Sequence, residues 1–220
     1  MHPVLRLYED VLSSANHVEF QLPALPRFIF VVHGSASING EPFNEGEAWQ
    51  GAGAATVKPS ASGVTCWRWE LARGDQGSVV ASAPGMLTHE KLSAYLETMP
   101  KGDLLMRGDS VAFPPGGCAY THVHQGPGIR CLIEGGIRID THGRSTSYGV
   151  GGAWYESGPD PVFAQGSADR ASRFIRVMIL PRDLTGKSSI QYVNEEDKAR
   201  PKSQSYKIYA DAPIEFAVKK

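Results

Sequence analysis

The sequence predicts an all-β protein, and three observations carry this prediction. Short segments rich in valine, isoleucine, phenylalanine and tryptophan follow one another along the 220 residues, and glycine, proline and asparagine separate them. The turn signals recur at a spacing of about 8–12 residues, which is typical of a β-sandwich or β-barrel. Convincing helical periodicity is scarce, and one pattern of segments occurs twice. We therefore expect two small β-barrels and few short helices.

The expected strands fall into two groups, one in each half of the chain. Each is a run of β-branched, aromatic or alternating apolar residues that ends at a turn residue. The expected strands are 27–34, 35–40, 63–72, 129–136, 137–143 and 172–181. One helix is expected at 88–99, because Thr88 can cap it and because Leu92, Tyr95 and Leu96 would share a face.

An internal repeat organises the chain. Residues 28–40 align with residues 129–141, and residues 46–57 align with residues 151–162, which places a tryptophan at the same point of each half. A closing strand follows at a similar distance in both halves. Three matches in the same order indicate two copies of one β unit.

The repeat predicts the domain organisation. Residues 1–85 are expected to form the first barrel, and residues 86–190 the second. Residues 191–220 are expected to form a tail that begins with a charged, proline-containing linker and ends with alternating apolar residues. Such a tail can add an edge strand to its own barrel or to that of a partner.

Composition and charge exclude several classes of partner. The formal net charge is −1 and no long block of like charge occurs, so neither nucleic acid nor a membrane surface is expected. No apolar run could cross a bilayer and no leader pattern is visible, which predicts a cytoplasmic protein. Cys66, Cys118 and Cys131 form no CxxC spacing and indicate packing residues. The expected partners are a small molecule and a second copy of the chain in a homodimer.

The stretch "THVHQGPG" contains two histidines separated by one residue. Side chains alternate along a strand, so His122 and His124 would point to the same face and could converge on one ion. The alternation places Arg130 on that face too, unless the turn at 126–128 bulges the strand and reverses the phase. The alternative is a pair of histidines that faces solvent.

These residues resemble the first motif of the cupin superfamily, and in particular that of the bicupins. The motif is a glycine, an HxH pair and a glycine-ended strand, supplied here by Gly117, His122, His124 and Gly135. A second motif, a glycine followed by a short strand and a proline-containing turn, is supplied by residues 152–162. The resemblance is strong in the second half and weaker in the first. It implies two double-stranded β-helix (jelly-roll) barrels, with a metal inside any barrel that keeps its ligands.

Two of the customary cupin ligands are absent. The glutamate that usually follows the second histidine by four residues is Gly128 here, and the histidine that usually ends the second motif is Val162. Similar cupins carry a glutamate in a "WYEPPG"-like stretch, and Glu156 lies in "WYESG". The resemblance therefore implies that Glu156 takes over the carboxylate role. The alternative is an ion pair between Glu156 and an arginine, such as Arg130 or Arg176.

Two imidazoles and a carboxylate form a ligand set that leaves coordination positions open. The expected cofactor is a divalent metal held by His122, His124 and Glu156, and iron, zinc, nickel and manganese all suit these ligands. Such an ion polarises a bound oxygen, or lowers the pKa of its water from near 16 towards about 7. Arg130 could orient an anionic substrate or serve as a structural ion-pair partner. Tyr155 is a further catalytic candidate.

The first half lacks an equivalent site. Gly34 of the first half matches Gly135 of the second. The positions that match His124 and His122 are then Pro23 and Gln21, and the position that matches Glu156 is Gly51. The first barrel is therefore expected to be a structural or dimerising half.

Two functions remain open for the second half. One is a metal-dependent enzyme that acts on a small organic acid or carbonyl compound by dioxygenase-like, lyase-like or isomerase-like chemistry. The other is a non-catalytic cupin that binds a small ligand as a sensor or storage module, with a structural metal or none. Open coordination positions favour the first function, and the absence of two customary ligands favours the second.

Overall fold

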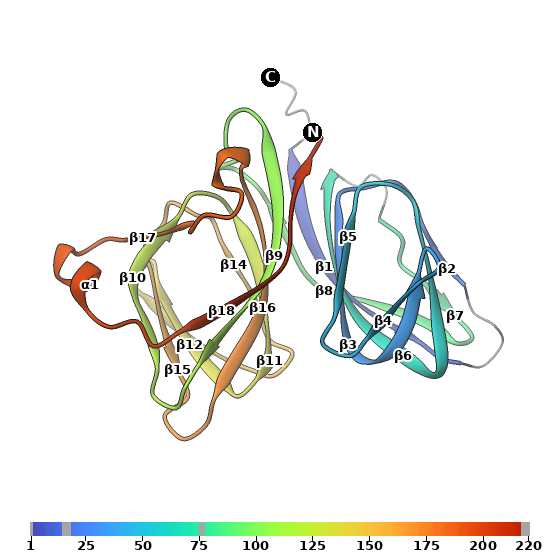
Figure 1. The fold of residues 1–220 in the computed structure, drawn as a ribbon, viewed down its shortest axis with the longest axis horizontal. Helices are drawn as coiled ribbons and strands as arrows, with labels where there is room; N and C mark the ends of the chain where they lie inside the picture. Colours follow the sequence, from blue (N-terminus) through green and yellow to red (C-terminus); the bar gives the residue numbers. More distant parts are fainter. Residues whose placement is uncertain (1, 15–18, 75–77, 217–220) are drawn as a thin grey trace. The chain divides into compact units, whose positions relative to one another are not determined.

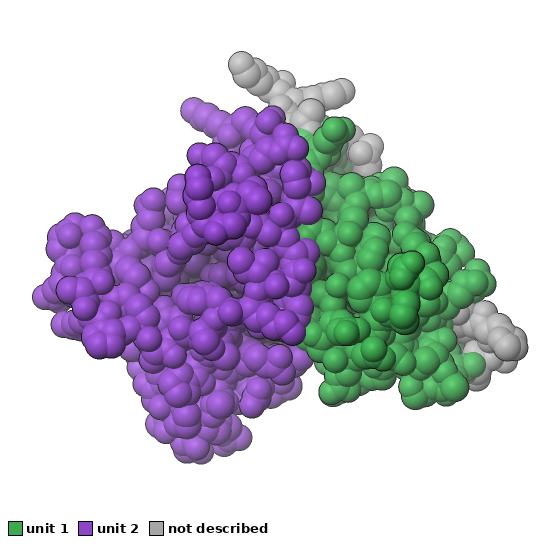
Figure 2. Space-filling model, in the orientation of Figure 1, with its two compact units in different colours: residues 1–96, 214–220 green, residues 97–213 purple. Residues whose placement is uncertain are grey.

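The regular secondary structure in the computed structural model of this chain is almost all antiparallel strand (Figure 1). It describes residues 2–14, 19–74 and 78–216. The chain divides into two compact units, residues 1–96 with 214–220 and residues 97–213 (Figure 2). The all-β fold expected from the sequence is confirmed.

The first unit is one eight-stranded sheet. Its strands are β1 (Pro3–Leu12), β2 (Phe20–Leu22), β3 (Arg27–Ile38), β4 (Glu41–Asn44), β5 (Ala48–Gly51), β6 (Ala55–Arg73), β7 (Ser82–Ala83) and β8 (Met86–Tyr95). The order along the sheet is β4-β3-β6-β1-β8-β7, with β2 paired to β6 and β5 paired to β3. Alternate residues of β3 and β6, among them Ile29, Val31 and Cys66, pack into a buried apolar cluster.

The second unit is a pair of five-stranded sheets that face each other (Figure 1). Its strands are β9 (Leu104–Phe113), β10 (Cys118–His124), β11 (Gly128–Glu134), β12 (Gly136–Thr141), β13 (Arg144–Gly149), β14 (Ala153–Glu156), β15 (Val162–Gly166), β16 (Ser172–Pro181), β17 (Ile190–Tyr192) and β18 (Ser205–Ile214). One sheet has the order β13-β12-β15-β10-β17, and the other has the order β14-β11-β16-β9-β18. Phe113, Leu132, Trp154 and Phe174 belong to the core of this unit.

Helices contribute little to the described part of the chain. They are the 3-10 helix η2 (Arg182–Leu184) and the five-residue helix α1 (Glu195–Ala199). Neither approaches the length and apolar character that a membrane crossing requires. The cytoplasmic location and the homodimer stay predictions.

The internal repeat is visible in the strand register. Ile29 of β3 pairs with Trp49 of β5, and Arg130 of β11 pairs with the matching Trp154 of β14. The chain then bends at Gly135, which has a φ of +78°, as it does at the matching Gly34 with a φ of +76°. Trp154 is buried and Trp49 is half-buried, in keeping with packing roles. The two halves therefore share one local architecture.

The helix expected at 88–99 is wrong. Most of this segment belongs to β8, which pairs with β1, and Thr88 donates a buried hydrogen bond of 2.6 Å to Asp10. Backbone pairing with an available strand outweighs the weak helical periodicity of a short segment. The boundary between the units consequently lies after Leu96 rather than after residue 85.

The tail completes the second unit's own sheets. β17 pairs with β10, and β18 lies beside β9 at the edge of the other sheet. Arg107 of β9 forms two hydrogen bonds with Asp211 of β18, at 3.0 and 2.9 Å. Of the two alternatives for an edge strand, the structure therefore has the one within the same chain.

The bend at Gly135 leads to a prediction about the free energy of unfolding. A Cβ at Gly135 would lie 2.2 Å from the carbonyl oxygen of Ala171, whereas a Cβ at Gly143, with a similar φ of +70°, would meet nothing within 4 Å. Gly143→Ala should cost only the left-handed backbone strain of about 1–2 kcal/mol. Gly135→Ala should cost about 1–3 kcal/mol more, because backbone must move. Denaturant unfolding of both variants measures the difference, and equal losses would contradict the close-approach explanation.

Candidate metal centre

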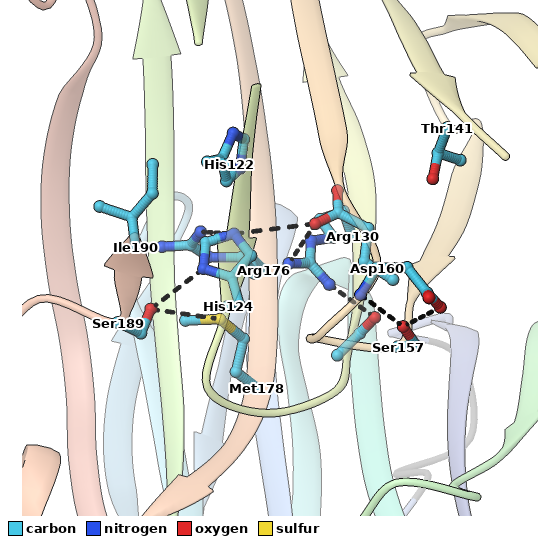
Figure 3. Close-up of polar contacts among 12 residues, drawn as sticks. His122, His124, Arg130, Thr141, Ser157, Asp160, Arg176, Met178, Ser189 and Ile190 are labelled. Atoms are coloured by element: carbon cyan, nitrogen blue, oxygen red, sulfur yellow. Dashed lines mark hydrogen bonds and ion pairs between the residues drawn. The ribbon is translucent and has the colours of Figure 1, made fainter. Parts of the chain in front are cut away.

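Strand β10 places both histidines inside the second unit. His122 and His124 are each 5 % exposed, and their ring centroids lie 4.9 Å apart. Residues two apart on a strand share a face, which explains why the rings lie together (Figure 3). The alternative of a solvent-facing pair is therefore wrong.

Glu156 reaches the histidines from β14. Its register partner on β11 is Gly128, the position where the cupin glutamate is missing. Directly opposed residues on antiparallel strands project to the same face, so a carboxylate on either strand can enter the same space. Gly128 itself has no room for a side chain, because a Cβ there would lie 2.4 Å from the carbonyl oxygen of Val177.

The three side chains form a compact cluster. One potential ligand atom from each of His122, His124 and Glu156 lies within 4.8 Å of the other two. Nε2 of His124 is 3.7 Å from Oε2 of Glu156. The cavity at this cluster has a volume of about 20 Å³, which suffices for an ion or a water molecule and is too small for an organic substrate.

Hydrogen bonds define which nitrogen of each ring carries a proton. Nδ1 of His122 lies 2.8 Å from the carbonyl oxygen of Tyr120, which can only accept, so Nδ1 donates and Nε2 keeps its lone pair. Nε2 of His124 lies 3.4 Å from Nη1 of Arg176, which can only donate, so this Nε2 also keeps its lone pair. Nδ1 of His124 is then the donor to Oγ of Ser189 at 3.3 Å. Both rings thus have the tautomer that a metal ligand needs.

Glu156 is held in place through its two carboxylate oxygens, but one of them has spare capacity to accept hydrogen bonds. Nε1 of Trp154 donates to Oε1 at 2.9 Å. Nη2 of Arg130 forms an ion pair with Oε2 at 2.7 Å, but among the described residues no hydrogen bond of good geometry reaches Oε2. A buried carboxylate oxygen with spare lone pairs fits a cation at this position.

Burial and neighbouring charges keep the histidines neutral. Burial lowers the pKa of His122, and burial together with the charges of Arg176 and Arg130 lowers the pKa of His124 well below its usual value. Burial also lowers the pKa of Arg130 to about 10, so Arg130 still carries its charge at neutral pH. Neutral imidazoles are the form that binds metals.

The charges in this region balance in pairs. Arg130 pairs with Glu156, and Arg176 makes two hydrogen bonds with Asp109, at 2.9 and 2.6 Å. A divalent cation would add two positive charges in a buried site. Uncompensated buried charge is costly, so an anion beside the cation would be favourable.

The structure brings most of the expected site residues together. His122, His124, Glu156 and Arg130 all line the small cavity. Arg130 is 1 % exposed. Its Nη1 donates to the carbonyl oxygen of Gly128 at 2.7 Å and its Nη2 lies 2.7 Å from Oε2 of Glu156, so its guanidinium is occupied by these two partners. Tyr155 is not among the lining residues, because it alternates with Glu156 along β14 and lies on the other face.

Asp109 and Ser189 were not expected from the sequence to lie at this site. Asp109 lies on β9, which carries charged residues among its apolar ones and was not expected as a strand. Ser189 precedes β17, in a stretch without apolar periodicity. A charge beside an otherwise apolar run could have indicated Asp109. The sequence contains no signal that would have brought Ser189 to His124.

The first unit holds a buried ion-pair network instead of histidines. Arg68 faces Ile29 across β6 and β3, as Arg176 faces Arg130 across β16 and β11. Glu70 lies 2.6 Å from Nε of Arg27 and 2.7 Å from Nη1 of Arg68, and all three side chains are fully buried. Asp10 lies 2.6 Å from Nε of Arg68. Among the described residues of the first unit, buried ion pairs thus lie where the second unit has Arg130 and Arg176.

Comparisons with known proteins agree with the fold. No protein-family model and no curated protein matches the sequence. A variant of oxalate decarboxylase from Bacillus subtilis matches over 89 % of this chain and 73 % of its own, with 12 % identity and a TM-score of 0.56. AerE from Microcystis aeruginosa matches over 82 % and 89 %, with 13 % identity and a TM-score of 0.56. The chain has the cupin fold. At these identities the likeness concerns the cupin fold and not the reaction.

The bond from Trp154 to Glu156 predicts an effect on metal affinity in this cupin fold. Trp154→Phe keeps an aromatic ring but removes the N–H that donates to Oε1. Loss of such a supporting hydrogen bond should weaken metal binding about 10- to 100-fold. Titration of the metal-free protein with Zn²⁺ against a competing chelator measures this change. Trp49→Phe, at the matching position of the first unit, is the control and should leave the affinity unchanged.

Proposed function

We propose that the second barrel is a metal-dependent centre that acts on a small organic acid. The observation that carries this proposal is the buried cluster of His122, His124 and Glu156, with ligand atoms within 4.8 Å of one another. Two neutral imidazoles and one carboxylate suit iron, zinc, nickel or manganese. When bound, such an ion supplies a Lewis acid that polarises a carboxylate or carbonyl oxygen.

The remaining residues prepare the cluster for this role. Trp154 and Arg130 hold the carboxylate of Glu156, and Ser189 orients the ring of His124. Arg130 is therefore proposed as a positioning residue for Glu156 rather than as the group that orients the substrate. Tyr155 has no proposed catalytic role.

An anionic substrate follows from the charge balance. The arginines of this region already have carboxylate partners, so a divalent ion would leave two positive charges that an organic anion can neutralise. Oxalate decarboxylase, a structural neighbour whose name states its activity, acts on oxalate, which makes decarboxylation the first reaction to test. The cupin fold hosts many reactions, so this choice rests on analogy.

A non-catalytic role is the second candidate, and the size of the cavity favours it. A volume of about 20 Å³ admits an ion but no substrate, so catalysis requires a side chain to move. A barrel in which no side chain moves would bind a structural metal only.

Metal analysis followed by turnover assays tests the proposal. The purified protein should contain about one divalent ion per chain. Protein reloaded with Mn²⁺, Fe²⁺, Ni²⁺ or Zn²⁺ is then assayed for product formation and for O₂ uptake with oxalate, malonate, pyruvate and acetoacetate. Metal with turnover of any of these acids supports the enzyme. Metal without turnover of any of them supports the structural role. A metal-free protein that cannot be loaded contradicts both metal-binding roles and supports a ligand-binding module without a metal.

A further inference from the structure

A second cavity lies next to the metal centre in the second unit. Its volume is about 210 Å³, below the roughly 300 Å³ at which drug-sized pockets begin, so it suits a small molecule. Arg176, Ile190 and Tyr206 line this cavity and also the small cavity at the histidines. These three residues are therefore the wall that the two cavities share. In Figure 3, Ile190 and Ser189 lie beside His124 and Arg176.

Arg176 connects the two cavities chemically. Its Nε and Nη2 are bound to Asp109, and its Nη1 lies 3.4 Å from Nε2 of His124. That nitrogen is the one that would bind the metal. An imidazole nitrogen has a single lone pair, so it cannot accept from Arg176 and ligate a cation at the same time.

Metal binding would therefore change both the hydrogen bonding and the electrostatic surroundings of Arg176. Its Nη1 would lose this acceptor while the side chain is only 7 % exposed, and a buried donor without a partner is unfavourable. The positive charges of the guanidinium and of the ion would also repel each other. An anion beside Arg176 would relieve both effects.

The lining of the larger cavity fits an organic anion. Arg176 and Lys187 supply two positive charges, of which Asp109 beside Arg176 neutralises one, the hydroxyl of Ser188 can donate a hydrogen bond, and Ile208 adds apolar surface. The guanidinium of Arg107 is already bound to Asp211 and to the carbonyl oxygens of Leu184 and Lys187, so it stiffens the wall instead. Charge together with apolar surface favours a small carboxylate with a short hydrocarbon part over an inorganic ion.

We propose that a small carboxylate binds in the larger cavity through Arg176, and that this anion and the metal bind cooperatively. The proposal rests on the proposed metal centre and specifies its ligand class. Binding linkage requires the effect to be reciprocal: the metal raises the affinity for the anion by the same factor as the anion raises the affinity for the metal. Arg176, and not Arg130, is the residue that recognises the anion.

The test measures Zn²⁺ affinity of the full, metal-free chain by calorimetry with and without saturating butyrate, a weak chelator. Butyrate should raise the affinity about 5- to 150-fold, the usual range of such coupling. Butyramide, its neutral counterpart, should have no effect. The reverse titration, butyrate into protein with and without Zn²⁺, should give the same factor.

Two variants locate the effect. Arg176→Met combined with Asp109→Asn removes both buried charges together, which avoids an unpaired carboxylate, and should abolish the coupling while Zn²⁺ still binds. Ile208→Glu places a negative charge in the larger cavity and should reduce the coupling, whereas Ile208→Gln should not. Coupling that persists in the double variant, or an effect of butyrate below twofold in the parent, would overturn this proposal alone. Failure of the parent to bind Zn²⁺ would overturn the metal centre, and the coupling with it.

Discussion

Replacing His122 by alanine is expected to lower the affinity for a divalent metal by more than about 100-fold. Loss of a residue that merely supports a ligand costs about 10- to 100-fold, and His122 is itself one of three ligands. The variant creates no unpaired buried charge, because burial lowers the pKa of His122 and keeps the ring neutral. The fold should therefore survive, and elemental analysis after dialysis should show a metal-free protein where the parent retains about one ion.

Two companion variants sharpen this result. His33→Ala is the control, because His33 is 74 % exposed in the first unit, and it should retain the metal. Glu156→Gln should also lose the metal, but it leaves the guanidinium of Arg130 without its charged partner and should destabilise the fold as well. Full retention of metal by His122→Ala would rule out the proposed ligand set.

Replacing Glu70 by alanine should give the largest loss of stability in the first unit, about 3–5 kcal/mol. Glu70 lies between the guanidiniums of Arg27 and Arg68, and all three side chains are fully buried. Without the carboxylate, two buried positive charges would face each other, and only Arg68 would keep a carboxylate partner, Asp10. The midpoint and slope of denaturant unfolding measure the change.

Glu134→Ala is the matched control. Glu134 forms an ion pair of 3.4 Å with Arg173, but both side chains are well exposed, at 54 % and 36 %. Solvent screens such a pair, so its loss should change the unfolding free energy by at most about 1 kcal/mol. A second test replaces Arg27, Arg68 and Glu70 by methionine and Asp10, the other partner of Arg68, by asparagine. This variant should restore much of the stability because it removes all four charges of the network together. Similar losses for Glu70→Ala and Glu134→Ala would show that burial does not decide the cost.

Much of the fold could be predicted because its signals are local. The strands that carry the repeat, the bends at Gly34 and Gly135, and the turn-rich spacing all depend on residues within a few positions of one another. The segment at 88–99 was predicted wrongly because its structure depends on a distant part of the chain. Its helical periodicity is local, but its pairing with β1 depends on a strand some eighty positions earlier, which no short window contains.

The metal centre, too, was predictable from the sequence only where its signals are local. The sequence by itself determined that His122 and His124 share one face, because the pleat of a strand alternates side chains whatever surrounds it. Only the tertiary structure decided that Glu156 enters opposite Gly128 and that Arg176 faces His124. It also decided that the tail closes the barrel beside them. These contacts join strands far apart in the chain, and the register that aligns them is set by the packing of the whole barrel rather than by any local pattern.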